Sequence, residues 1–167
     1  LNQKTINKPI NFEGITLHKG KYAKLKILPS SPNSGISFKR VDLTKNNIIV
    51  ANFCNVSDAT LCTTLSNDEG VNISTVEHLM AAFYGEGIDN ALVEIDAPEV
   101  PIMDGSSGPF VFLIECAGLV ELEAPRKVIR VLKEVEVKIG ESRAVLKPSD
   151  KSFFDVNIDF KGTAASD

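Results

Sequence analysis

The sequence lacks several features that mark whole classes of protein. None of its apolar runs is long enough to span a bilayer, and no signal peptide is visible at its start. It has no dense patch of lysine and arginine, and its formal net charge is −4. Nucleic-acid binding depends on such a patch to neutralise phosphates. We therefore expect a protein without a transmembrane segment and without a nucleic-acid partner.

Paired cysteines are also missing. Cys54, Cys62 and Cys116 are an odd number at irregular spacing, with no Cys-x-x-Cys pair. This pattern does not build a disulfide framework and suits reduced thiols, so we expect a cytoplasmic location. Histidine is equally scarce, with only His18 and His78 in the chain.

What is present is typical of a globular protein with its own core. Hydrophobic residues make up 43% of the chain and charged residues 24%. Lysines between residues 19 and 26 alternate with apolar residues, which predicts the solvated face of a strand. Period-two patterns predict strands over residues 5–12, 21–28, 35–41, 51–55, 61–66 and 91–96. Helical spacing predicts helices over 75–84 and 109–117, the second with Ser106 or Ser107 as N-cap and Pro109 in its first turn.

Strands gathered around two helices indicate an α+β, two-layer domain of sheet plus helices. A boundary is expected near residues 123–125, which gives a first domain over 1–124 and a second, incomplete one over 125–167. The second part shows strand patterns over 127–139, 143–147 and 153–160, with a turn at Gly140. Such strands without covering helices leave an apolar face open, through which we expect self-association.

Residues 74–81 (STVEHLMA) carry the clearest chemical signal. Ser74 followed by Glu77 is typical of a capping box, and apolar residues follow at helical spacing. Glu77 and His78 then fall off the apolar stripe, so we expect them to be displayed. The alternative is a structural role, because many helices carry a capping-box glutamate and a surface histidine without any catalysis. The zinc motif His-Glu-x-x-His is absent, so this helix alone does not hold a metal.

Four segments in order resemble one enzyme family, UDP-3-O-acyl-N-acetylglucosamine deacetylase, the zinc amidase of lipid A synthesis in Gram-negative bacteria. They are residues 14–20 (GITLHKG), 61–64 (LCTT), 74–82 continuing to 87–90 (STVEHLMAA, GIDN) and 97–106 (APEVPIMDGS). The similarity runs from about residue 5 to 160.

The resemblance implies a zinc-dependent hydrolase, with His78 as a Zn²⁺ ligand and Glu77 as the general base. It also implies a UDP-linked acylated glucosamine as substrate. The zinc ion would lower the pKa of a bound water, and the carboxylate would take its proton as the amide is attacked. His18, Leu61, Cys62 and Asp104 match positions near the family's active site. For His18 a turn residue is the plain alternative, and for Asp104 the Asp-Gly turn.

The family's other zinc ligands, a His and an Asp one helical turn apart, lie further along a second domain that repeats the architecture of the first, and this chain resembles only the first strands of that domain. A catalytic zinc normally takes three protein ligands. We therefore expect the chain to carry about half of an active site, as a fragment whose remaining ligands lie elsewhere. The alternative is a catalytically inactive truncated domain or a binding module.

Overall fold

The computed structural model describes residues 1–158 of the chain. These residues divide into two compact units, a first unit of Leu1–Lys127 and a second unit that begins at Val128. The first unit carries every element around the candidate site, and the second contains a hairpin.

A five-stranded sheet forms one layer of the first unit. Its order is β2-β3-β9-β4-β5, and β4 and β9 are its only parallel neighbours among the described residues. The strands are β2 (Ile10–Ile15), β3 (Tyr22–Pro29), β4 (Ile36–Arg40), β5 (Ile48–Val50) and β9 (Ala91–Ile95).

Side chains of β3 alternate between the core and solvent. Ala23, Leu25 and Ile27 are buried, whereas the lysines between them are exposed. In the register of the central pair, Leu25 lies opposite Ile95, which places two buried residues on the same face. The predicted solvated lysine face is therefore confirmed.

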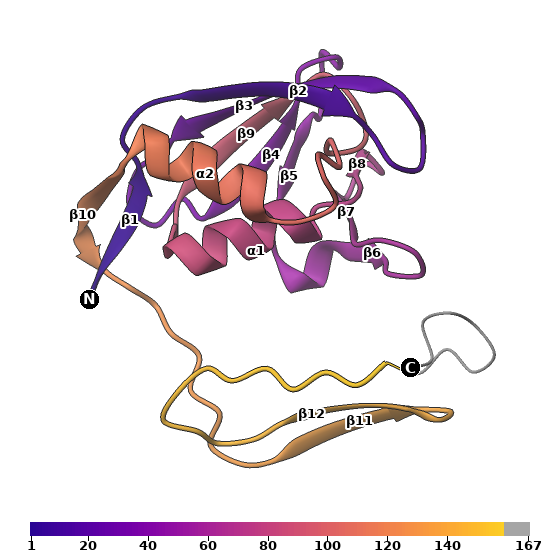
Figure 1. Ribbon diagram of the computed structural model, residues 1–167, viewed down its shortest axis with the longest axis vertical. Coiled ribbons are helices and arrows are strands. Elements are labelled where there is room, and N and C mark those ends of the chain that lie inside the picture. The colour runs from indigo at the N-terminus through magenta and orange to yellow at the C-terminus, as the bar shows by residue number, and fades with distance from the viewer. Residues whose placement is uncertain (159–167) are drawn as a thin grey trace. The chain divides into compact units, whose positions relative to one another are not determined.

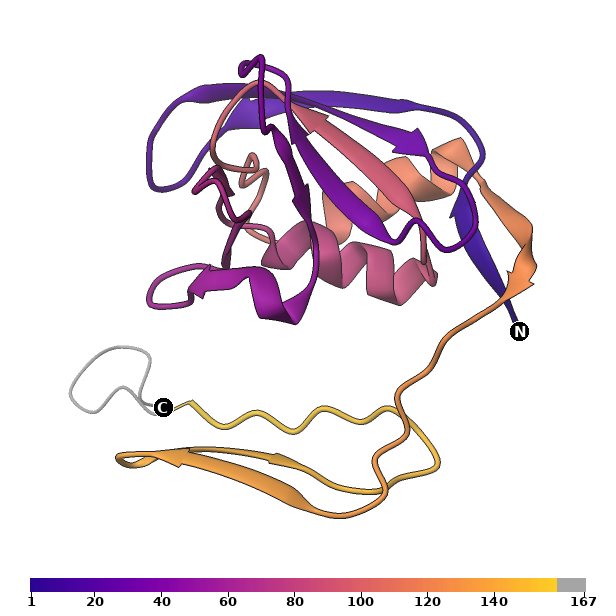
Figure 2. The ribbon, with the colours of Figure 1, turned by 180° about the vertical axis from the view of Figure 1, so that it is seen from behind.

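Two helices form the second layer, α1 (Glu77–Glu86) and α2 (Gly108–Ala117). Figures 1 and 2 show both on the same face of the five-stranded sheet. Phe38 of the sheet, Phe83 of α1 and Phe110 of α2 are almost fully buried between the layers. The Phe110 ring meets Phe12 edge-on, with centroids 5.3 Å apart. The predicted α+β class, a sheet covered by helices, is confirmed.

Smaller sheets flank this pair of layers. β1 (Asn2–Ile6) pairs with β10 (Leu119–Pro125), and β6 (Val56–Asp58), β7 (Thr64–Ser66) and β8 (Asn72–Ile73) form a three-stranded sheet. A short 3₁₀ helix, η1 (Phe53–Asn55), precedes β6.

The second unit contains the hairpin of β11 (Val135–Ile139) and β12 (Ser142–Leu146). Gly140 makes the turn with a φ of 59°, where glycine has no steric penalty. Directly opposite residues share a face in an antiparallel pair. Val137 therefore shares a face with Ala144, and Lys138 shares the other face with Arg143.

Several predicted elements are wrong. The strand expected over 5–12 is two strands in different sheets, separated at Pro9, which has no N–H to donate to a ladder. Residues 51–55 contain η1 rather than a strand, and Phe53 is exposed. Residues 153–158 form no strand, while the last two residues of that prediction lie outside the described part. The strand over 119–125 was not predicted, although Glu121 and Glu123 alternate there with apolar residues.

Candidate functional site

The entry to α1 does not contain the predicted capping box. The N-cap position is Val76, which makes no side-chain cap, and the helix begins at Glu77. The Ser74 hydroxyl instead donates to the Pro98 carbonyl at 3.1 Å. Glu77 Oε2 accepts the Thr63 backbone N–H at 2.9 Å. The carboxylate is thus turned toward a neighbouring loop, because its capping partner is committed elsewhere.

The backbone before α1 is fixed by pairing with residues 98–100. Ser74 N–H donates to the Pro98 carbonyl, and Val100 N–H donates to the Ser74 carbonyl, both at 3.0 Å. Thr75 follows with a φ of 56°. A β-branched residue is rarely found in this left-handed region, which costs on the order of 1–3 kcal/mol. Surrounding contacts must therefore hold Thr75 in place.

Glu99 supplies such contacts from a position with no solvent exposure. Its Oε1 accepts the Thr75 hydroxyl at 3.0 Å and the His18 N–H at 2.8 Å. Its Oε2 accepts the Lys19 N–H at 3.0 Å. Burial raises the pKa of Glu99, but these hydrogen bonds from His18, Thr75 and Lys19 outweigh it, so the pKa lies below its usual value. The carboxylate is therefore ionised and joins the 16–21 turn to the entry of α1.

The segment around Glu99 also pairs with the end of β2. Thr16 and Pro101 form a bridge, and Ile102 N–H donates to the Ile15 carbonyl at 3.0 Å. The His18 side chain is exposed, while its backbone N–H is bound to Glu99. His18 therefore binds Glu99 through its main chain and not through its side chain.

Glu77 and His78 lie side by side at the start of α1, both half-buried. The core side of the helix is formed by Leu79, Ala82 and Phe83. The pair lies off this core side, as expected, but it is less displayed than expected because both side chains are partly covered. Within residues 1–158, the His78 ring has no hydrogen-bonding or ion-pair partner.

Leu61, Cys62 and Asp104 differ in their surroundings. The Leu61 side chain is 82% exposed, and Cys62 Sγ lies 3.8 Å from the Thr64 hydroxyl. The loop that contains Leu61 and Cys62 contacts α1 through the next residue, Thr63, whose backbone N–H donates to Glu77.

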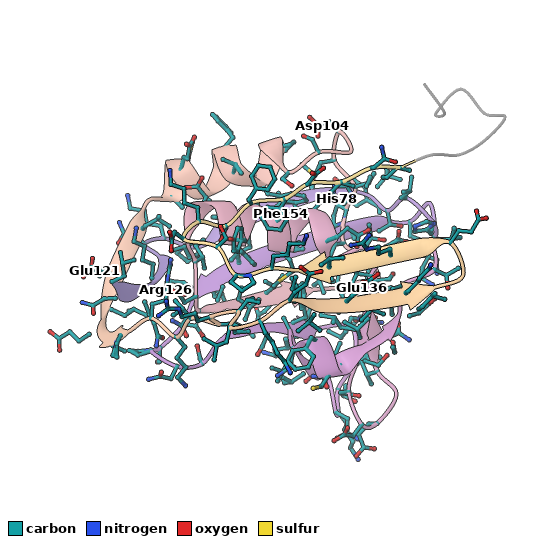
Figure 3. The ribbon with its side chains drawn as sticks, turned by 90° about the horizontal axis from the view of Figure 1, so that it is seen from below. His78, Asp104, Glu121, Arg126, Glu136 and Phe154 are labelled. Carbon is teal, nitrogen blue, oxygen red and sulfur yellow. The ribbon has the colours of Figure 1, made fainter. Side chains whose placement is uncertain are left out.

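Asp104 lies in the loop that leads into α2, and Figure 3 labels it together with His78. Asp104 Oδ1 accepts both the N–H and the hydroxyl of Ser106, at 2.9 and 2.8 Å. These bonds lower its pKa. Ser106 Oγ in turn accepts the Gly108 N–H at 3.1 Å, whereas Ser107 makes no side-chain cap. Asp104 thus orders the turn before α2.

The described residues do not build a zinc site by themselves. Within residues 1–158, no three His, Cys, Asp or Glu side chains gather closely enough to hold a metal ion. His78 offers one ring nitrogen with no competing partner, which is a single donor where a catalytic zinc takes three. Any zinc bound here would need donors from outside this part of the chain.

Sequence reasoning missed three residues of this arrangement, Thr63, Thr75 and Glu99. Thr63 acts through its backbone N–H, and Thr75 acts through its positive φ and a hydroxyl bond to the distant Glu99, none of which residue type reveals. Glu99 could have been found, because a single carboxylate between Pro98 and Val100-Pro101 in an otherwise apolar run needs buried donors.

Among residues 1–158, no helix is long and apolar enough to cross a bilayer.

Comparisons with known proteins give a single consistent result. Residues 3–167 match the LpxC family model, described as UDP-3-O-acyl N-acetylglycosamine deacetylase. A UDP-3-O-acyl-N-acetylglucosamine deacetylase of Methylococcus capsulatus is 49% identical over 160 residues, which is 96% of this chain and 52% of that protein. A protein of the same name from Shewanella baltica is 47% identical over 158 residues, 95% of this chain and 52% of its own length. The chain thus spans about half the length of the curated relatives it matches.

Proposed function

Because the chain belongs to the UDP-3-O-acyl N-acetylglycosamine deacetylase family, we propose that it forms part of an enzyme of lipid A synthesis. That enzyme hydrolyses the N-acetyl amide of a UDP-linked, 3-O-acylated glucosamine. The products are acetate and a free amine on the sugar. The cytoplasmic location expected from the unpaired cysteines belongs to the same proposal.

The observation that carries this proposal is the arrangement of Glu77 and His78 at the start of α1. One carboxylate oxygen of Glu77 is held by the Thr63 N–H, and the other oxygen remains for a second partner. The adjacent His78 ring is partly exposed and has no competing partner in the described part of the chain. A fixed carboxylate beside an available imidazole suits a general base next to a metal ligand.

In this proposal His78 supplies one ligand to a zinc ion, and the remaining protein ligands come from the half of the enzyme that the chain does not match. When bound, zinc lowers the pKa of a coordinated water toward neutrality. Glu77 accepts a proton at its carboxylate and is oriented for this by the bond from Thr63. We also propose that His18, Leu61, Cys62 and Asp104 line the approach to the site, as the family resemblance implies.

The test uses the 167-residue chain and a completed chain, in which these residues are followed by the part of the Methylococcus capsulatus relative outside the match. Zinc content after dialysis and amine release from UDP-3-O-acyl-N-acetylglucosamine are measured for both. We expect the completed chain to hold zinc and turn over substrate, and the 167-residue chain to do neither. Tight zinc binding by the 167-residue chain would contradict the half-site.

Variants of the completed chain test the two roles. Glu77→Ala should keep zinc and lower kcat by about 10²- to 10⁴-fold, the usual contribution of a general base. His78→Ala should lose both zinc and turnover. Glu86→Ala is the matched control, because Glu86 lies at the other end of the same helix.

Turnover at the parental rate in Glu77→Ala would refute the catalytic role. Absence of zinc and turnover from the completed chain would favour the second candidate, a non-catalytic domain. That candidate is supported by the absence of a metal-binding cluster in residues 1–158.

A further inference from the structure

Glu99 is the fully buried carboxylate of the first unit that the proposed reaction leaves unused. It lies in a segment that joins two others, the turn at 16–21 and the residues just before α1. Burying a carboxylate is unfavourable unless hydrogen bonds compensate. Three donors converge on Glu99, and two of them are backbone N–H groups.

The third donor, the Thr75 hydroxyl, lies two residues before Glu77. Thr75 has a positive φ, and its side chain is almost fully buried. The Thr75 conformation sets the direction in which the chain enters α1, and therefore where the first helical side chains point. The bond from its hydroxyl to Glu99 Oε1 holds that conformation in place.

We propose that Glu99 is a positioning residue, which holds Thr75 and the His18–Lys19 backbone together and thereby fixes Glu77 and His78 for reaction. This inference rests on the proposed function, because it assigns Glu99 to the same site. Glu99 touches neither Glu77 nor His78 through a hydrogen bond and acts through Thr75 and the paired backbone of Ser74.

The chemistry of the three donors makes Glu99→Gln an informative variant. Glu99 Oε1 accepts two hydrogens and Oε2 accepts one. A glutamine keeps the size but turns one acceptor into an NH₂ donor. If the glutamine oxygen takes the place of Oε1, it still accepts the hydrogen bonds from His18 and Thr75. The NH₂ group then faces the Lys19 N–H, so that two donors oppose each other.

Thr75 offers a complementary pair of variants. Thr75→Val keeps the branched shape but removes the hydroxyl donor. Thr75→Ser keeps the donor and should behave like the parent. Asp89→Asn is the matched control, because Asp89 Oδ2 also accepts several N–H groups, from Lys4 and Arg126, at the β1–β10 side of the first unit.

The experiment has two readouts. In the 167-residue chain, ¹H–¹⁵N NMR reports the amides of His18, Lys19 and residues 74–78. In the completed chain, kcat and KM for deacetylation are measured well below the unfolding temperature of each variant. We expect Glu99→Gln to shift these amides and to lower kcat by about 10- to 100-fold, the cost of a misplaced reacting group, while KM changes less than about threefold.

Thr75→Val should also shift these amides and lower kcat, whereas Thr75→Ser and Asp89→Asn should keep the parental kcat. If Glu99→Gln does not fold, Thr75→Val decides in its place. Unshifted amides at 74–78, or a parental kcat in both Glu99→Gln and Thr75→Val, would overturn the inference. Glu77→Ala in the same assay distinguishes failure of the proposed function from failure of the positioning role. Turnover by Glu77→Ala refutes the proposed function, whereas an inactive Glu77→Ala beside an active Glu99→Gln refutes the positioning role alone.

Discussion

At the scale of single residues, buried charge near the site is compensated by several hydrogen bonds at once. Arg40 is only 8% exposed and holds Asp42 through two bonds, Nε to Oδ1 at 2.8 Å and Nη2 to Oδ2 at 2.7 Å. Its third nitrogen donates to the Asn72 carbonyl at 2.8 Å. Because Asn72 lies two residues before Ser74, this ion pair supports the strand that leads to the site. A bidentate pair of this kind is stronger than most surface ion pairs.

The Arg40–Asp42 pair predicts a dependence of stability on pH. Hydrogen bonding and charge from Arg40 hold the pKa of Asp42 below its ordinary value of 3.8. A lowered pKa in the folded state stabilises the protein above pH 3.8, and this stabilisation is lost as the pH falls through the lowered pKa. The free energies of unfolding of the parent and of Asp42→Asn, measured by urea denaturation, should therefore converge as the pH falls below about 4. Asp68→Asn, an exposed carboxylate outside the pair, is the control. A constant difference between parent and Asp42→Asn from pH 7 to pH 3 would contradict this.

At the scale of elements, sequence patterns predicted the helices better than the loops between them. The apolar spacing over 109–117 predicted α2 to within one residue, whereas α1 spans Glu77–Glu86 instead of the predicted 75–84 and ends at Gly87 in a left-handed conformation. The capping box of Ser74 and Glu77 failed because backbone pairing with Pro98 is a contact between distant segments, which local spacing does not contain. For the same reason the similar motifs could be recognised one by one, whereas the hydrogen bonds that join Glu99 to His18, Lys19 and Thr75 could not be predicted.

Helix α2 permits a direct test of the helix-on-sheet core. Phe110 is 1% exposed and Phe112 is 63% exposed on the same helix. Phe110→Ala leaves a cavity between the layers and should lower the free energy of unfolding by about 3–5 kcal/mol. Phe112→Ala removes the same atoms from a largely solvated position and should cost well under half as much. Chemical denaturation measures both, and equal losses would show that the helix packs through another face.

At the scale of the whole chain, the second unit is distinguished by the hairpin of β11 and β12. A two-stranded hairpin is marginally stable alone and needs a partner for its apolar face. In the hairpin, Val135, Val137 and Ile139 share a face with Ala144 and Leu146, while Glu136 and Arg143 pair at 3.0 Å on the charged face. The boundary predicted at residues 124 and 125 and the incompleteness of the second domain stay predictions.

This amphipathic hairpin predicts self-association of the 167-residue chain. Val137 is 59% exposed on the apolar face, so contact with a second copy would remove it from water. Sedimentation equilibrium should show a concentration-dependent rise in mass that Val137→Lys reduces. Lys138→Ala, on the opposite face, should leave association unchanged. A monomer at all concentrations, or equal association of both variants, would refute this use of the face.

The most direct measurement is anomalous diffraction at the zinc edge from crystals of the completed chain. We predict a zinc peak about 2.0–2.1 Å from a ring nitrogen of His78, the usual length of a zinc–imidazole bond, with the Glu77 carboxylate beside it but not bound to it. Zinc bound elsewhere, with His78 free of metal, would contradict the placement of the active site at the entry to α1.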